Sequence, residues 1–174
     1  MGKNWNDKVQ VKKVDIGEEI IDTLLMDEGY HIFASLINGP HLFDRYAFNL
    51  EKNKHFYFDV KTKARLNNWE AQGIDEKHYL KYLEASEKFN LPFYIFFIDE
   101  NNGEIYSADI KKLKDKLFYI PMKKTNNDKI VAWNLKDMKY IGIINDNNVL
   151  NKLKCYNSRN YTISQIQTIP FLYE

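Results

Sequence analysis

An aspartate and a lysine two residues apart, Asp59 and Lys61, lie within the stretch FYFDVKTKAR, which covers residues 56–65. Successive side chains of a β-strand point to opposite faces, so Asp59 and Lys61 share one face while Phe58 and Val60 share the other. Such a pair is either a solvated ion pair worth less than about 1 kcal/mol or half of a metal-dependent phosphodiesterase site. Only this pair follows an aromatic run that can build a core; the same spacing recurs at Asp75/Lys77, Asp109/Lys111 and Asp137/Lys139.

A second carboxylate, Asp44, is predicted to face the first across a hairpin. If residues 51–54 form the loop, Leu50 pairs with His55 and Asp44 lies opposite Lys61, on the face that carries Asp59. A slip of one residue in this pairing would separate the carboxylates. Two carboxylates held together favour a bound cation, and oxygen ligands suit Mg²⁺ or Mn²⁺. Such an ion can polarise a phosphate and activate water, with a lysine beside it to stabilise the developing charge.

The elements that position these residues follow from hydrophobic periodicity and turn signals. Apolar residues at helical spacing predict a helix that Asp15 caps and Gly29 ends, and a second amphipathic helix over residues 75–90. Residues 63–74 are predicted to form a polar connection. Four strands are predicted around these helices, over residues 30–36, 43–50, 55–63 and 91–99, the last of them buried on both faces.

The C-terminal part gives weaker signals. NNG at residues 101–103 turns the chain into EIYSADI, an expected edge strand, and two more strands are expected over residues 130–133 and 138–144. A short helix is expected within NDNNVLNKLKCYN. The order helix, three strands, helix, strand favours one α/β layered structure with a mixed sheet.

Taken in order, the acidic helix GEEIIDTLLMDEGY, the strand-start aspartate of GPHLFD, the FDVKTK element, a polar linker and a helix resemble the PD-(D/E)xK nuclease superfamily. The likeness is greatest to its small Holliday-junction-resolvase-like and restriction-endonuclease-like members and covers residues 17 to about 100. It implies a restriction-endonuclease-like mixed β-sheet core flanked by helices, over about 14–110. In that case the chain is a single domain, 1–174, whose C-terminal extension of about 111–174 adds strands or a helix.

The resemblance also implies a site and an activity. In that superfamily a helical glutamate, a strand-start aspartate and the acid and lysine of the D/E-x-K element form a Mg²⁺ (or Mn²⁺) site that hydrolyses DNA phosphodiester bonds. The corresponding residues are Glu18, Asp44, Asp59 and Lys61, with the backbone carbonyl of Val60 as a further metal ligand. The chain departs from the pattern in having Phe43, not proline, before Asp44. Glu19 is a rival for Glu18, which is favoured because Ile21 and Leu25 turn its helix face inward.

Four residues beyond the lysine are candidate nucleic-acid contacts: Lys63 and Arg65 on phosphates, and Trp69 and Gln72 near the nucleic acid. The alternative for each is a solvated loop anchored by one tryptophan. Tyr79 and Tyr82 are predicted to face the core rather than to stack on bases. The four histidines lack metal-ligand spacing and are interpreted as structural or surface residues.

The composition limits the classes of function. With 174 residues, 44% hydrophobic, and a net charge of +1, the chain is a globular protein without the charge of a general polyanion binder. One cysteine excludes a disulfide framework, and with no apolar run of membrane-spanning length we expect a cytoplasmic protein. No glycine-rich phosphate loop is present. The expected partner is DNA, with a homodimer as one possible assembly; the alternative is an inactive nuclease-fold module for nucleic-acid binding or protein assembly.

Overall fold

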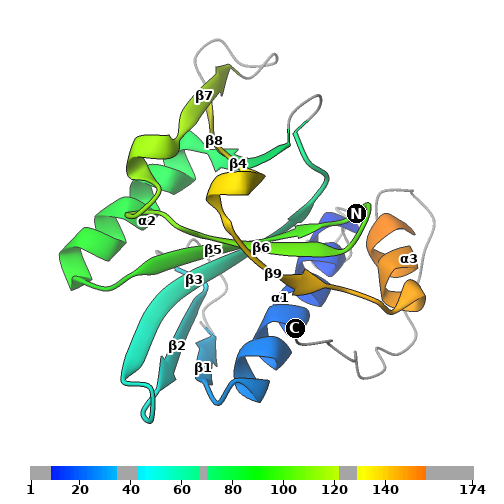
Figure 1. Ribbon diagram of the computed structural model, residues 1–174, viewed down its shortest axis with the longest axis horizontal. Coiled ribbons are helices and arrows are strands. Elements are labelled where there is room, and N and C mark those ends of the chain that lie inside the picture. Colours follow the sequence, from blue (N-terminus) through cyan, green and yellow to red (C-terminus); the bar gives the residue numbers. More distant parts are fainter. Residues whose placement is uncertain (1–8, 35–42, 67–69, 122–128, 156–174) are drawn as a thin grey trace, which may run out of the picture.

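A computed structural model describes residues 9–34, 43–66, 70–121 and 129–155, and within them the fold is built on a six-stranded mixed sheet (Figure 1). Only the neighbours β3 and β5 are parallel. In spatial order the strands are β1 (His31–Ala34), β2 (Arg45–Asn49), β3 (Lys54–Lys63), β5 (Phe93–Asp99), β6 (Glu104–Asp109) and β9 (Lys139–Ile143). The mixed α/β architecture predicted from the sequence is confirmed.

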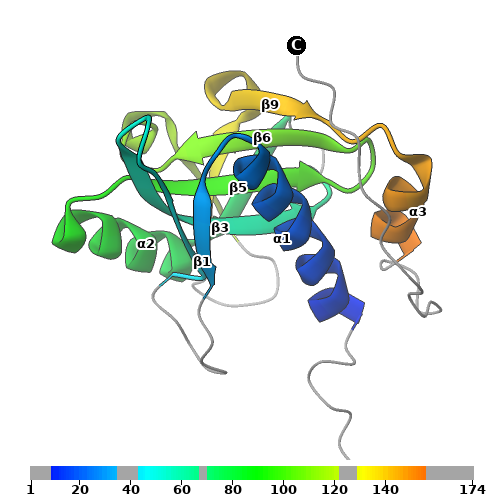
Figure 2. The same cartoon turned by 90° about the horizontal axis from the view of Figure 1, so that it is seen from below.

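A second, antiparallel sheet and three helices complete the described structure. The small sheet has the order β4 (Ala71–Asp75), β8 (Lys129–Asn134), β7 (Phe118–Pro121) and lies at the top of Figure 1. The helices are α1 (Val9–Asp27), α2 (Glu76–Phe89) and α3 (Asn147–Cys155), and Lys114–Lys116 and Leu135–Asp137 form single 3₁₀ turns. Figure 2 shows α1 running beside β3, with α3 at one end of the sheet. No helix in the described ranges is both long and apolar enough to cross a bilayer.

Several predicted boundaries need correction. Helix α1 begins at Val9, so Asp15 lies inside it and is not its cap. Its predicted end is confirmed, because Gly29 has φ of +81° and donates to the carbonyl of Met26, a turn that favours glycine. The predicted edge strand, β6, is internal since β9 pairs with its outer side. Strand β4 lies within the predicted polar connection, and β7 was not predicted at all.

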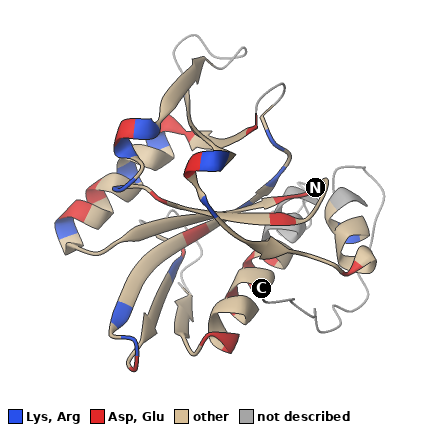
Figure 3. Ribbon diagram, in the orientation of Figure 1, with Lys and Arg blue, Asp and Glu red and all other residues tan. Residues whose placement is uncertain are grey.

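Helix α2 separates a buried from a charged face, as its periodicity predicted. Its buried residues are Tyr79, Tyr82, Ala85 and Ser86. Figure 3 shows lysines and acids interspersed along the helix, and Lys77, Lys81, Glu84 and Glu87 are exposed. Asn90 ends the helix in the left-handed conformation that short polar residues tolerate. The buried face packs over β5 and the small sheet, and Tyr82 also reaches Asp59 of β3.

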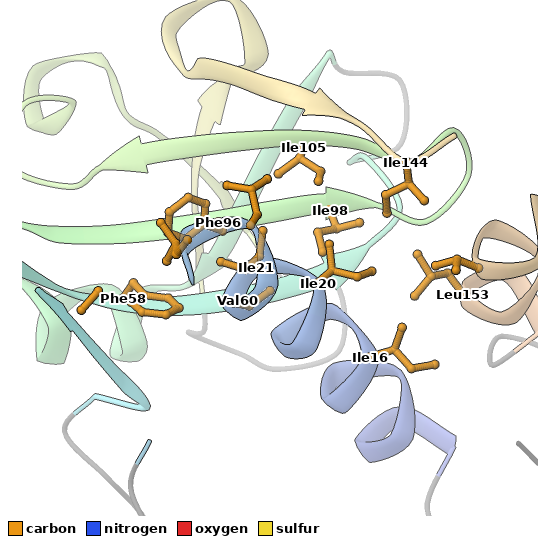
Figure 4. Close-up of a cluster of buried hydrophobic side chains, with 14 of the residues drawn as sticks. Ile16, Ile20, Ile21, Phe58, Val60, Phe96, Ile98, Ile105, Ile144 and Leu153 are labelled. Carbon is orange, nitrogen blue, oxygen red and sulfur yellow. The ribbon is translucent and has the colours of Figure 1, made fainter. Parts of the chain in front are cut away.

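The core has two parts, one on each face of the main sheet. On one face, α1 and α3 cover Phe56, Phe58 and Val60 of β3 together with β5 residues, and Figure 4 shows Ile20 and Ile21 of α1 close to Val60 and Ile98, with Ile16 on the side of Leu153. On the other face, α2 and the small sheet cover Tyr57 and the odd-numbered residues of β5. The alternation predicted for β3 is therefore confirmed, and the face of Tyr57 is also the face of Asp59 and Lys61.

Candidate active site

The hairpin of β2 and β3 sets the position of Asp44 relative to Asp59. Its pairs run from Arg45 opposite Phe58 to Asn49 opposite Lys54, so the predicted pairing of Leu50 with His55 is wrong by two residues. The turn begins earlier because the side-chain oxygen of Asn49 accepts from the backbone N–H of Lys52 at 2.8 Å. A shift of two residues keeps every side chain on its predicted face. Continued by one residue beyond Arg45, this register brings Asp44 opposite Asp59 rather than opposite Lys61.

Asp59 is the most buried of the four candidate catalytic residues, at 1% exposure. Its Oδ2 accepts a hydrogen bond of 2.5 Å from the hydroxyl of Tyr82 and forms an ion pair with the ammonium group of Lys61. Its Oδ1 is buried and has no hydrogen-bond partner within the described part of the chain. A buried carboxylate oxygen without a donor is costly, and a cation would relieve that cost.

Glu18 reaches the same region from α1, through an ion pair that the sequence analysis did not predict. The guanidinium of Arg45 lies 2.6 Å from Glu18 and 3.1 Å from Asp22, one helical turn further along α1. Burial raises the pKa of Glu18, Arg45 lowers it, and the negative charges of Asp44 and Asp59 raise it further. The negative charges of Asp44 and Asp59 therefore act on Glu18, whereas Glu19 is exposed.

Lys61 is half-buried, with 27% of its side chain exposed. It lies in the strand two residues beyond Asp59, where β2 no longer flanks β3. The backbone carbonyl of Val60 lies between these two residues, while the Val60 side chain is buried in the core on the other face.

The side chains of Lys63 and Arg65, which were predicted to contact phosphates, contact other groups of the protein instead. Lys63 turns inward: its ammonium group donates to the carbonyl of Gly73, and burial lowers its pKa to about 8. The guanidinium of Arg65 is paired with carboxylates of Glu70, Asp99 and Glu104.

Gln72 is fully buried and donates to the carbonyl of Lys63 at 3.3 Å. These positions argue against phosphate or base contacts by Gln72 and Arg65. Trp69 lies outside the described residues.

Two further residues at the site were not assigned a role from the sequence. Tyr82 was correctly expected to face the core, but its hydroxyl also meets Asp59. Burial raises the pKa of Tyr82, and the charge of Asp59 raises it further, so the hydroxyl stays a donor. His78 is half-buried one turn earlier, and burial and then Lys61 lower its pKa. The signal for Tyr82 was its place on the inward face of a helix that packs over β3.

The site offers carboxylate and carbonyl oxygens, which are the ligands that Mg²⁺ or Mn²⁺ prefers. Oδ1 of Asp59, which is buried and has no hydrogen-bond partner among the described residues, could coordinate such an ion. As positioned, however, no three acidic, histidine or cysteine side chains of the described residues are grouped closely enough to hold a metal ion. Arg45 and Lys61 supply the positive charge beside Glu18 and Asp59 instead.

Comparison with known proteins identifies a similar backbone. The structure resembles Hjc, a Holliday junction resolvase from the archaeal hyperthermophile Archaeoglobus fulgidus, with a TM-score of 0.49 and 12% sequence identity, over 74% of this chain and 92% of that chain. Such a likeness concerns the arrangement of the backbone alone. No family model and no curated protein sequence matches the chain.

Proposed function

We propose that the chain is a nuclease that hydrolyses DNA phosphodiester bonds with a divalent cation, using Glu18, Asp44, Asp59 and Lys61. The observation that carries the proposal is the buried carboxylate of Asp59, which has one oxygen without a hydrogen-bond partner among the described residues and lies beside the half-buried Lys61. A purely structural ion pair gains little from burying such an oxygen, because the desolvation cost is not recovered.

In this proposal the residues have different roles. Oδ1 of Asp59, the carboxylates of Asp44 and Glu18 and the carbonyl of Val60 would hold Mg²⁺ or Mn²⁺. The bound ion would polarise the scissile phosphate. The ammonium group of Lys61 would leave Asp59 to stabilise negative charge on the phosphate or to orient the attacking water. Arg45 holds the Glu18 carboxylate close to the hairpin.

A second candidate is a module of this fold that binds nucleic acid or protein without catalysis. The ion pair of Arg45 with Glu18 favours it, because a carboxylate neutralised by a guanidinium is a poorer metal ligand. The two candidates differ in one measurable property, which is turnover.

Cleavage of plasmid DNA and of a four-way junction, in Mn²⁺ and in chelator, tests the proposal. The Lys61→Ala variant should lower kcat about 100-fold or more while changing Mn²⁺ affinity much less, since an ammonium group is not a ligand. Lys139→Ala is the matched control, because Lys139 follows Asp137 at the same spacing and is exposed. Cleavage by Lys61→Ala at the wild-type rate would place the chemistry elsewhere, and an inactive wild type would favour the binding module.

A further inference from the structure

Tyr82 is tied to the candidate site by a single, well-defined contact. Its hydroxyl lies 2.5 Å from Oδ2 of Asp59, and the two side chains are 7% and 1% exposed. The contact joins α2 to β3, two elements that are separate in the sequence. The hydrogen bond from a neutral hydroxyl to a carboxylate is of the strong, charge-assisted kind.

The ring of Tyr82 is held in place independently of this hydrogen bond. It stacks on Phe93 of β5 with centroids 4.4 Å apart and an interplanar angle of 15°. Because Phe93 is fully buried, the phenol ring has a fixed support and its hydroxyl has a fixed position. Lys61 has no comparable support, since a lysine side chain is long and 27% of this one is exposed.

The two oxygens of Asp59 are consequently unequal. Oδ2 receives both the Tyr82 hydroxyl and the Lys61 ammonium group, whereas Oδ1 has no partner within the described residues. An oxygen that already accepts two donors is a poor ligand, so Oδ1 is the oxygen left for a cation. If Lys61 turns toward a phosphate, the bond from Tyr82 is what keeps the carboxylate in the same orientation.

We infer that Tyr82 is a positioning residue, whose hydroxyl orients the Asp59 carboxylate for cation binding and retains it while Lys61 acts on the substrate. The inference rests on the proposed function and adds a residue to it. Groups that hydrogen-bond to metal ligands typically change metal affinity or activity by about 10- to 100-fold when removed.

The same helix offers a matched control. Tyr79 lies one turn before Tyr82, is 3% exposed, and has a buried hydroxyl without a hydrogen-bond partner in the described structure. Removing that hydroxyl keeps the ring and breaks no hydrogen bond to a described residue. Tyr82→Phe likewise keeps the ring on Phe93 and removes only the donor to Asp59.

The test is a calorimetric titration with Mn²⁺ of wild type, Tyr82→Phe, Tyr79→Phe and Tyr82→Leu, with melting temperatures and cleavage kinetics measured in parallel. Tyr82→Phe should bind Mn²⁺ about tenfold or more weakly and lower kcat with little change in KM for DNA. Tyr79→Phe should match wild type, and Tyr82→Leu should bind Mn²⁺ no better than Tyr82→Phe.

Wild-type Mn²⁺ affinity in Tyr82→Phe, or equal losses in Tyr82→Phe and Tyr79→Phe, would overturn the positioning role while leaving the proposed function in place. If Tyr82→Phe binds Mn²⁺ like wild type and Tyr82→Leu binds it much more weakly, the effect belongs to ring packing. That result would also overturn the positioning role of the hydroxyl. A wild type that neither binds Mn²⁺ nor cleaves DNA would overturn the proposed function and this inference together.

Discussion

At the scale of single residues, the candidate site depends on how buried charge is compensated. Asp59 is almost fully buried, and its carboxylate accepts a hydrogen bond from the Tyr82 hydroxyl and forms an ion pair with Lys61. Glu18 is paired with Arg45. Buried charges are tolerated only when partners satisfy them. The alternation of β3 was enough to predict that Asp59 and Lys61 share a face, whereas the place of Asp44 beside them stays a prediction. It could not predict Arg45, whose importance depends on α1 presenting Glu18 and Asp22 to it.

Lys63 gives a prediction about pH. The folded protein releases the Lys63 proton at a pKa of about 8, lowered from 10.5 chiefly by burial, whereas the unfolded chain retains it to the higher value. Between these pKa values the unfolded state binds more protons, so this group makes the free energy of unfolding rise with pH. The wild type should therefore gain stability relative to Lys63→Met as the pH rises from about 7 to about 10.

Urea unfolding of both proteins at the two pH values measures this difference. Other groups titrate in both proteins and cancel in the comparison. A difference in unfolding free energy that stays constant with pH would mean that Lys63 titrates normally and is not buried.

At the scale of elements, local sequence predicted those whose contacts are local. The β2–β3 hairpin and α2 were found because alternation and helical spacing are visible within a few residues. Strand β4 was missed because AQGID has little strand character of its own and is stabilised by pairing with β8, far along the chain. Gly73 fits there since a Cβ would lie 2.5 Å from the carbonyl of Val131. Strand β6 was predicted to be an edge strand for the same reason, because its partner β9 also lies far along the chain.

The packing of α1 on β3, which brings Glu18 to the site, depends on Gly17. A Cβ at that position would lie 1.9 Å from the hydroxyl oxygen of buried Thr62. Gly17→Ala should therefore destabilise the protein by about 1–3 kcal/mol through overpacking, although alanine favours helices by about 1 kcal/mol. Chemical denaturation checks this value.

The control is Gly142→Ala in β9, where an added Cβ would meet nothing within 4 Å. This variant should be as stable as wild type or slightly more stable. Equal stability of Gly17→Ala and wild type would show that α1 is not held against β3 as closely as described.

At the scale of the whole molecule, charge limits how DNA could be recognised. The net charge is +1, and basic and acidic residues are interspersed over the described elements (Figure 3). Reading bases directly requires an element that presents several side chains to base edges, and the exposed face of α2 carries mixed charges instead. Binding that depends on phosphate contacts should weaken steeply with salt.

We therefore expect cleavage directed by DNA shape or spread over many sequences. Cuts should be mapped on a long random-sequence duplex and on a four-way junction, with affinity measured at low and physiological salt. Asp59→Asn serves as the control, because it should bind DNA but not cut it. Cuts confined to one short sequence by the isolated protein would contradict this expectation.

The proposed chemistry requires that Asp59 is a ligand for a divalent cation. Mn²⁺ should therefore be titrated calorimetrically into wild type, Asp59→Asn and Asp137→Asn. Asp137 is followed by a lysine at the same spacing but pairs with the exposed Lys116 outside the site, so its variant should bind like wild type. Wild type and Asp137→Asn should bind Mn²⁺, and Asp59→Asn should lose binding while its fold is retained. Equal Mn²⁺ binding by Asp59→Asn, or binding by none of the three proteins, would show that Asp59 is not a cation ligand.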